Sequence, residues 1–143
     1  MVASAYRAHK SAVEGAMSNA TTRGVRVRVA PRYHPEHSHP DQGEWFFSYT
    51  VEIANVGETP VRLLSRHWVI TDARGHVEHV RGPGVVGEQP HLAPGERFTY
   101  TSFCPLPTSL GAMHGSYTME LDSGERFEAT VAPFGLVDPD TEN

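Results

Sequence analysis

The feature that most constrains this chain is a period-two alternation of apolar and polar residues, which begins at residue 25 and recurs almost to the end. In the first such segment three valines alternate with two arginines over residues 25–29. Further strand or hairpin patterns lie at residues 46–53, 97–102, 116–121 and 126–131. Alternation with this period places apolar side chains on one face of a β-strand, whereas a helix needs a period of 3.6. The pattern predicts strands and indicates no helix after residue 20.

Turn-forming residues separate these segments and set the fold class. Clusters rich in Gly, Pro, Asn and Asp lie at residues 55–60, 72–75, 93–96 and 122–125. About seven strands with this punctuation predict an all-β fold, an antiparallel β-sandwich of the immunoglobulin or fibronectin type III kind. A single cysteine cannot form the inter-sheet disulfide of immunoglobulin domains, which favours the fibronectin-like version.

Residues 61–72 carry apolar side chains at both odd and even positions, which predicts a central strand covered on both faces. Arg66 lies in this segment at the same parity as Trp68. A buried arginine needs a partner, and the sequence offers Asp72, a distant carboxylate, or the face of the Trp68 indole.

The same pattern divides the chain into three parts. Residues 1–20 are small and polar, without the apolar core of a secretory signal, and are predicted to form a mobile N-terminal extension. Residues 21–136 are predicted to form the sandwich domain. Residues 137–143 form an acidic tail that is predicted to be mobile.

Composition excludes several classes of function. No apolar run approaches the roughly 18 residues that cross a bilayer, so we expect no membrane insertion. The lone Cys104 favours a reducing cytoplasm and a structural thiol. The net charge of −5 argues against nucleic-acid binding. The motifs G-x-S-x-G and H-E-x-x-H and a P-loop lysine are missing, so we expect no catalytic residues and no enzyme.

Three glycines, Gly82, Gly84 and Gly87, spell G-x-G-x-x-G, the pattern of a dinucleotide-binding turn. That turn needs a helix opening within it and an acidic residue about twenty positions later. Prolines follow the glycines instead, and no Asp or Glu lies near residue 107. The segment is therefore interpreted as a glycine-rich loop between strands, which could present backbone N–H groups to an anion or dock a protein.

The candidate binding residues follow from this interpretation. The predicted binding loop comprises Arg81, Gly82, Gly84, Gly87 and Gln89. The predicted contacts to a small anion such as pyrophosphate are His79, Arg81 and His91.

Two further groups of residues suggest other ligands. His37 and His39 form a His-x-His pair near several carboxylates, which is compatible with a divalent metal ion. Arg26, Arg28 and Arg32 form a basic stripe on the first strand. Arg26 and Arg28 could protect a sheet edge or bind an acidic partner.

Several longer motifs resemble the bacterial ApaG family, also called CorD. They are LLSRHWVITD, then GPGVVGEQP, then LAPGE, and the similarity extends over about residues 21–136. The resemblance implies a fibronectin type III-like sandwich and an association with cobalt and magnesium efflux. Related domains in eukaryotic F-box proteins and in a protein that interacts with DNA polymerase delta look like protein-interaction modules. The family's glycine motif matches Gly82, Gly84 and Gly87, and no catalytic residue is carried over.

The leading hypothesis is a non-enzymatic binding domain that contacts an unidentified protein partner and needs no cofactor. Two alternatives stay open: a pyrophosphate- or nucleotide-binding protein that uses the glycine loop, which would include an enzyme, and a direct divalent-metal binder. An unpaired sheet edge is also compatible with a homodimer.

Overall fold

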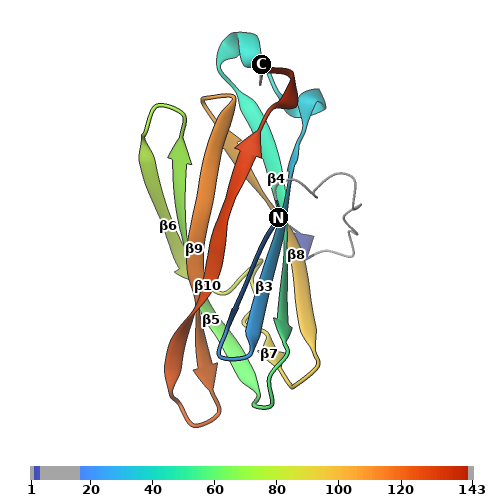
Figure 1. Ribbon diagram of the computed structural model, residues 1–143, viewed down its shortest axis with the longest axis vertical. Coiled ribbons are helices and arrows are strands. Elements are labelled where there is room, and N and C mark those ends of the chain that lie inside the picture. Colours follow the sequence, from blue (N-terminus) through green and yellow to red (C-terminus); the bar gives the residue numbers. More distant parts are fainter. Residues whose placement is uncertain (1, 4–16, 142–143) are drawn as a thin grey trace.

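The computed structural model describes residues 2–3 and 17–141, which form an antiparallel β-sandwich (Figure 1). Its elements are β1 (Val2–Ala3), β2 (Ser18–Thr22), β3 (Val25–Tyr33), the 3₁₀ turns η2 (Pro35–His37) and η3 (Pro40–Gln42), β4 (Trp45–Asn55), β5 (Val61–Asp72), β6 (Val77–Pro83), β7 (His91–Leu92), β8 (Arg97–Leu106), β9 (Leu110–Leu121), β10 (Arg126–Val137) and the 3₁₀ turn η4 (Pro139–Thr141). The predicted all-β sandwich is confirmed. Among the described residues, seven strands span seven residues or more and three are shorter. The predicted number of about seven therefore matches the long strands.

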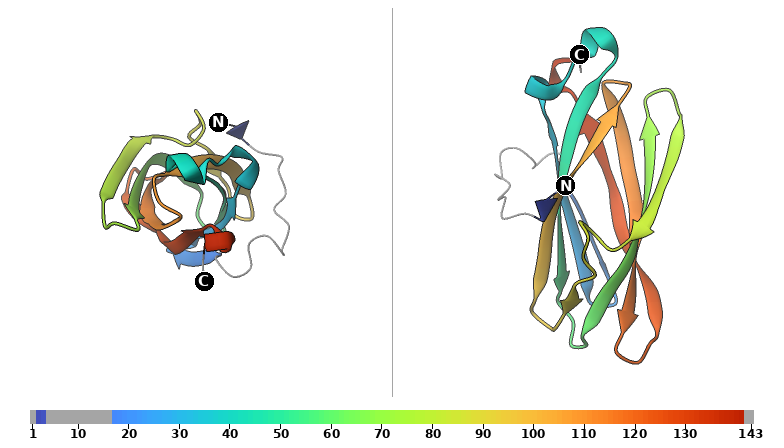
Figure 2. Two further views of the ribbon diagram at one scale, coloured as in Figure 1. Left: turned by 90° about the horizontal axis from the view of Figure 1, so that it is seen from above. Right: turned by 180° about the vertical axis from the view of Figure 1, so that it is seen from behind.

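The strands form two sheets with only antiparallel pairings. The first sheet has the order β1-β8-β4-β3-β2, and the second has the order β10-β9-β5-β6 with β7 also beside β5. Viewed along the long axis, the two sheets surround one core (Figure 2). No helix in the described part of the chain is long and apolar enough to cross a membrane.

The predicted alternation matches the inward faces of the strands. In β4, Phe47, Val51 and Ile53 are fully buried, and Tyr49 is 6% exposed. Facing them from the second sheet, Trp68 packs its ring 5.2 Å from the ring of Tyr49, measured between centroids. The core therefore lies between the sheets, as period-two burial requires.

The central strand β5 differs from its predicted form. Its pairing with β9 shifts register between Leu63 and Ser65, which is a β-bulge at Leu64. Before the bulge odd-numbered residues such as Leu63 face the core, and after it even-numbered residues such as Trp68 do so. The apolar residues at both parities reflect this change of face, and the prediction of a strand covered on both faces is wrong.

The N-terminal strands also change two interpretations. Strand β3 lies between β2 and β4 over residues 25–29, so Arg26 and Arg28 do not protect a sheet edge. Strand β2 begins at Ser18, three residues before the predicted start of the domain at residue 21. Most of the predicted extension, residues 1–20, lies outside the described residues. In the predicted tail, Asp138 is 3% exposed and accepts a hydrogen bond from the Trp45 indole.

Candidate functional site

The glycine loop, defined here as residues 84–89, follows β6 and leads toward β7 (Figure 2). Val85 and Glu88 exchange two backbone hydrogen bonds of 2.8 Å, which makes Val86 and Gly87 the centre of a tight turn. Both central residues have positive φ, +43° at Val86 and +81° at Gly87, as a type I′ turn requires. A β-branched residue rarely adopts positive φ. The surrounding contacts therefore impose the shape of this turn.

Arg66 fixes the entry to the glycine loop. Its Nη1 donates hydrogen bonds to the carbonyl oxygens of Pro83 and Gly84, at 3.0 and 2.9 Å. Gly82 lies against the guanidinium, where an added Cβ would be 2.9 Å from Nη2. Asp72, one of the partners that the sequence offers for Arg66, instead accepts hydrogen bonds at Oδ1 from the backbone of the β5–β6 turn. Arg66 therefore binds the backbone at the start of the loop.

The bulge in β5 fastens the other side of the loop. The Leu64 carbonyl accepts hydrogen bonds of 2.8 Å from the Gly84 amide and from Gln89 Nε2. The Gln89 carbonyl accepts a further bond of 2.7 Å from Arg62 Nη1. Val85 is fully buried in the core. The loop is thus anchored at both ends and in its middle.

This anchoring limits what the loop backbone can offer an anion. The amides of Gly84, Val85 and Glu88 all donate within the protein. Gly84 itself is buried, and an added Cβ there would lie 2.3 Å from the Glu88 carbonyl oxygen. The exposed part of the loop is its outer edge, Gly87, Glu88 and Gln89. These residues form a shaped surface more than an open cradle of N–H groups.

Two of the predicted anion contacts lie on the outer face of the second sheet. His79 on β6 stacks on His67 of β5, with His67 Nε2 2.9 Å from His79 Nδ1. Arg81 is paired with His67 in the strand register. Partial burial, the Arg81 charge and His79 together lower the pKa of His67. This pair is not evident from the sequence, because only the register of β5 and β6 places His67 beside His79.

The third predicted anion contact, His91, lies elsewhere. It is opposite Arg62 in the pairing of β7 with β5, and its Nε2 is 3.1 Å from Asp122 Oδ1. Val69, opposite His79, is seven residues farther along β5, which corresponds to roughly 20 Å. The structure therefore does not bring His91 together with His79 and Arg81.

The metal candidates His37 and His39 lie in the turns between β3 and β4. His37 Nε2 is 3.9 Å from the Glu36 carboxylate, while the backbone of His39 bonds to Glu44. Glu36 is also held by His34, at 3.1 Å. Within residues 2–3 and 17–141, no three His, Cys, Asp or Glu side chains are grouped closely enough to hold a metal ion.

Cys104 is buried at 4% exposure on the inner face of β8. Burial raises the pKa of its thiol to about 12. The thiolate is the nucleophilic form of cysteine. The thiol therefore stays protonated at neutral pH, which agrees with a structural role.

Comparison with known proteins places these features in a family. A model of the ApaG domain matches residues 35–121, which include β5 and the whole glycine loop. The chain is 56% identical over 127 residues to Protein ApaG of Anaeromyxobacter sp. (strain K), covering 89% of this chain and 100% of that protein. It is 56% identical over 124 residues to Protein ApaG of Rhodopseudomonas palustris (strain TIE-1), covering 87% and 95%. A solved Bordetella pertussis structure described as an ApaA protein superposes with a TM-score of 0.79 at 52% identity, covering 80% of this chain and 94% of that one.

Proposed function

Because the chain belongs to the ApaG family, we propose that it is a non-enzymatic binding domain that docks a protein partner through the outer edge of its glycine loop. The family resemblance associates such domains with cobalt and magnesium efflux. The proposed role in that process is to bind a protein, in the cytoplasm, without carrying the metal ion itself.

The observation that carries the proposal is the anchoring of the glycine loop. Hydrogen bonds to Arg66, Leu64 and Arg62 hold its backbone at Gly84 and Gln89. A surface that is ordered before binding loses little conformational entropy on association, which favours affinity. Gly87, Glu88 and Gln89 are exposed on this fixed backbone. The proposed docking surface consists of these three residues and the adjoining Arg81.

The two alternatives have less support. An anion site in the loop would use backbone amides, and three of those amides already donate within the protein. A metal site at His37 and His39 would need a third protein ligand at the same point, and the described residues supply none.

The test compares two charge reversals on exposed turns. Glu88→Arg changes the docking surface, and Glu58→Arg makes the same change in the exposed turn between β4 and β5. Each variant and the unchanged protein would capture partners from a lysate of the native organism. A captured protein would then be purified and its dissociation constant measured by calorimetry.

We expect Glu88→Arg to weaken binding of the captured protein at least tenfold and Glu58→Arg to leave it within twofold. Equal affinity for all three proteins, with unchanged thermal melting curves, would remove the glycine loop as the docking surface. A turnover of substrate by the purified domain alone would contradict the non-enzymatic assignment.

A further inference from the structure

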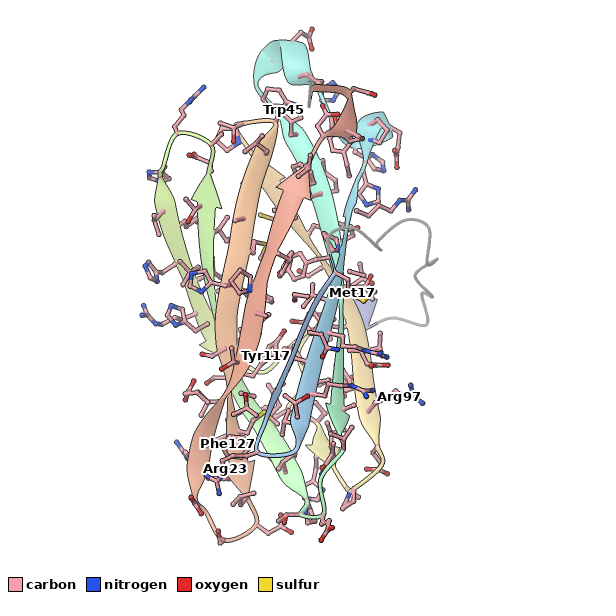
Figure 3. All side chains as sticks on the ribbon, viewed as in Figure 1. Met17, Arg23, Trp45, Arg97, Tyr117 and Phe127 are labelled. Carbon is pink, nitrogen blue, oxygen red and sulfur yellow. The ribbon has the colours of Figure 1, made fainter. Side chains whose placement is uncertain are left out.

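A basic pocket on the outer face of the first sheet has no part in the proposed docking surface. Arg26 on β3 pairs with Ala54 on β4, and Ala54 pairs with Arg97 on β8. The three residues therefore form a row across three strands, with the small alanine between the two arginines. Side chains in such a row point to the same face of the sheet. Figure 3 shows Arg97 at the surface of β8, directed away from the sandwich.

All three residues of the row line a pocket of about 230 Å³. Ala54 leaves the space between the arginines open because its side chain is a single methyl group. The turns beyond the strands, at Asn55–Gly57 and Gly95, close one end of the pocket. The charged residues that line it are therefore both arginines.

Glu52 lies next to this row and holds its arginines in place. It is opposite Arg28 in the strand register, and its carboxylate contacts Arg28 at 2.8 Å, Arg97 at 3.1 Å and Arg26 at 3.4 Å. Three guanidinium groups surround one carboxylate, which leaves a local charge of +2 in a chain with a net charge of −5. A bound anion would offset this excess of positive charge.

The arginines also retain unused hydrogen-bond donors. A guanidinium has five N–H groups, and the Arg26 side chain makes one long contact to Glu52. Its Nε is buried without a hydrogen-bond partner. Arg97 bonds Glu52 through Nη1, and its side chain is 65% exposed. The Arg26 and Arg97 side chains are 31% and 65% exposed, so their remaining Nη donors can reach a ligand above Ala54, whereas the buried Arg26 Nε cannot.

We propose that this pocket binds a phosphate group between Arg26 and Arg97. A phosphate monoester carries a charge of about −1.5 to −2 at neutral pH, which balances the local excess. Its tetrahedral oxygens accept hydrogen bonds from guanidinium forks on two sides. Inorganic phosphate and a small organic phosphate share this chemistry.

The proposal is tested by titration followed through backbone amide NMR signals. The protein would be titrated with sodium phosphate and, separately, with glycerol 2-phosphate, each against sodium chloride at matched ionic strength. We expect saturable shifts of Ala54, Gly57 and Gly95 with phosphate and none with chloride. Tenfold tighter binding of the ester identifies an organic phosphate as the ligand, whereas equal affinities show that the site recognises the phosphate group alone.

Two variants examine the site. Arg97→Gln removes one wall, and Ala54→Leu fills the pocket without changing the charge. We expect each to weaken phosphate binding at least tenfold. Arg126→Gln is the matched control, because Arg126 is a similarly exposed arginine paired with a glutamate on the other sheet. Its affinity should stay within twofold of the unchanged protein.

Three results would overturn the proposal. The first is a shift that rises linearly with phosphate as it does with chloride. The second is an equal loss of affinity in Arg97→Gln and Arg126→Gln, which would indicate general charge attraction. The third is full binding by a folded Ala54→Leu variant, because the pocket would then not be where phosphate sits. Amide spectra of each variant establish that it is folded.

Discussion

The three glycines of the G-x-G-x-x-G pattern are required for different physical reasons. Gly82 leaves room for the Arg66 guanidinium. Gly84 combines a φ of +60° with close contact to the Glu88 carbonyl, and Gly87 has a φ of +81° with open space around it. The pattern that resembles a dinucleotide-binding turn is therefore a set of steric requirements of the end of β6 and of the glycine loop that follows it.

These differences predict unequal effects of alanine. Gly87→Ala should cost about 1 kcal/mol of unfolding free energy, for left-handed backbone alone. Gly84→Ala should cost about 2 kcal/mol more, because its Cβ forces apart the two hydrogen bonds between Val85 and Glu88. Urea denaturation measures both values. Equal losses of unfolding free energy in the two variants would mean that the backbone accommodates the added Cβ at position 84 and keeps both hydrogen bonds between Val85 and Glu88.

The ionisation of Glu52 makes the stability of the fold depend on pH. Partial burial opposes its ionisation, but hydrogen bonds from Arg97 and Arg28 outweigh burial and lower the pKa of its carboxyl. A carboxyl whose pKa is lower in the folded state stabilises the fold above its unfolded pKa of about 4.3. This stabilisation is lost as the pH falls through the folded pKa.

Glu52→Gln should therefore lower the unfolding free energy by about 1–2 kcal/mol at pH 7. The difference between the two proteins should shrink as the pH falls below about 4. Chemical denaturation at pH 7 and pH 3 would measure it. A difference that is the same at both pH values would show that the amide disturbs packing and that the ion pairs contribute nothing.

At the scale of elements, β8 and β9 are joined across the core by one pair of hydroxyls. Tyr100 and Tyr117 are buried to 2% and 0% exposure, and their hydroxyl groups hydrogen-bond to each other. Burial raises the pKa of both phenols, so they remain neutral. The bond connects the first sheet to the second.

Removing either hydroxyl should leave the other buried with its main partner lost. Tyr100→Phe and Tyr117→Phe are each expected to cost about 1–3 kcal/mol. The double variant should lose clearly less unfolding free energy than the two single variants together, because it leaves no hydroxyl of this pair without a partner. Thermal and urea unfolding of the four proteins give the coupling energy. Additive costs would indicate that each hydroxyl is stabilised independently.

The strands could be predicted from the sequence where the alternation of apolar and polar residues within one segment was enough to identify the buried face. The alternation in β4 gives its inward residues directly, because Phe47, Val51 and Ile53 obey one parity. The bulge at Leu64 was not predictable, because a bulged strand with one buried face shows the same mixed parity as a strand buried on both faces.

The candidate sites show the same limit. The residues of the predicted binding loop lie within positions 81–89, so a local sequence pattern was enough to identify them. Arg26 and Arg97 are 71 positions apart and meet only through the register of β3, β4 and β8. His67 and His79 likewise meet through the pairing of β5 with β6. Register depends on the whole sheet, and no local pattern in these segments specifies it.

At the scale of the molecule, the domain depends on strand β2. Ser18–Thr22 forms five residue pairs with β3, and Ser18 is 5% exposed. A protein that begins at Met17 should keep its melting temperature within about 2 °C, whereas one that begins at Val25 should lose more than about 5 °C. Calorimetry would measure both. Equal melting temperatures would place the boundary of the stable domain after β2.

Strand β2 also lies against β10, and the amide of Thr130 donates a hydrogen bond of 3.1 Å to Thr22 Oγ1 across 108 positions of sequence. Ribosomes add about 5–20 residues per second, so β10 is made roughly 5–20 s after β2. During that interval the nascent chain cannot close this side of the sandwich, and the apolar faces of its first strands lack their final cover. The bond between Thr22 and Thr130 can therefore form only after nearly all of the domain has been synthesised.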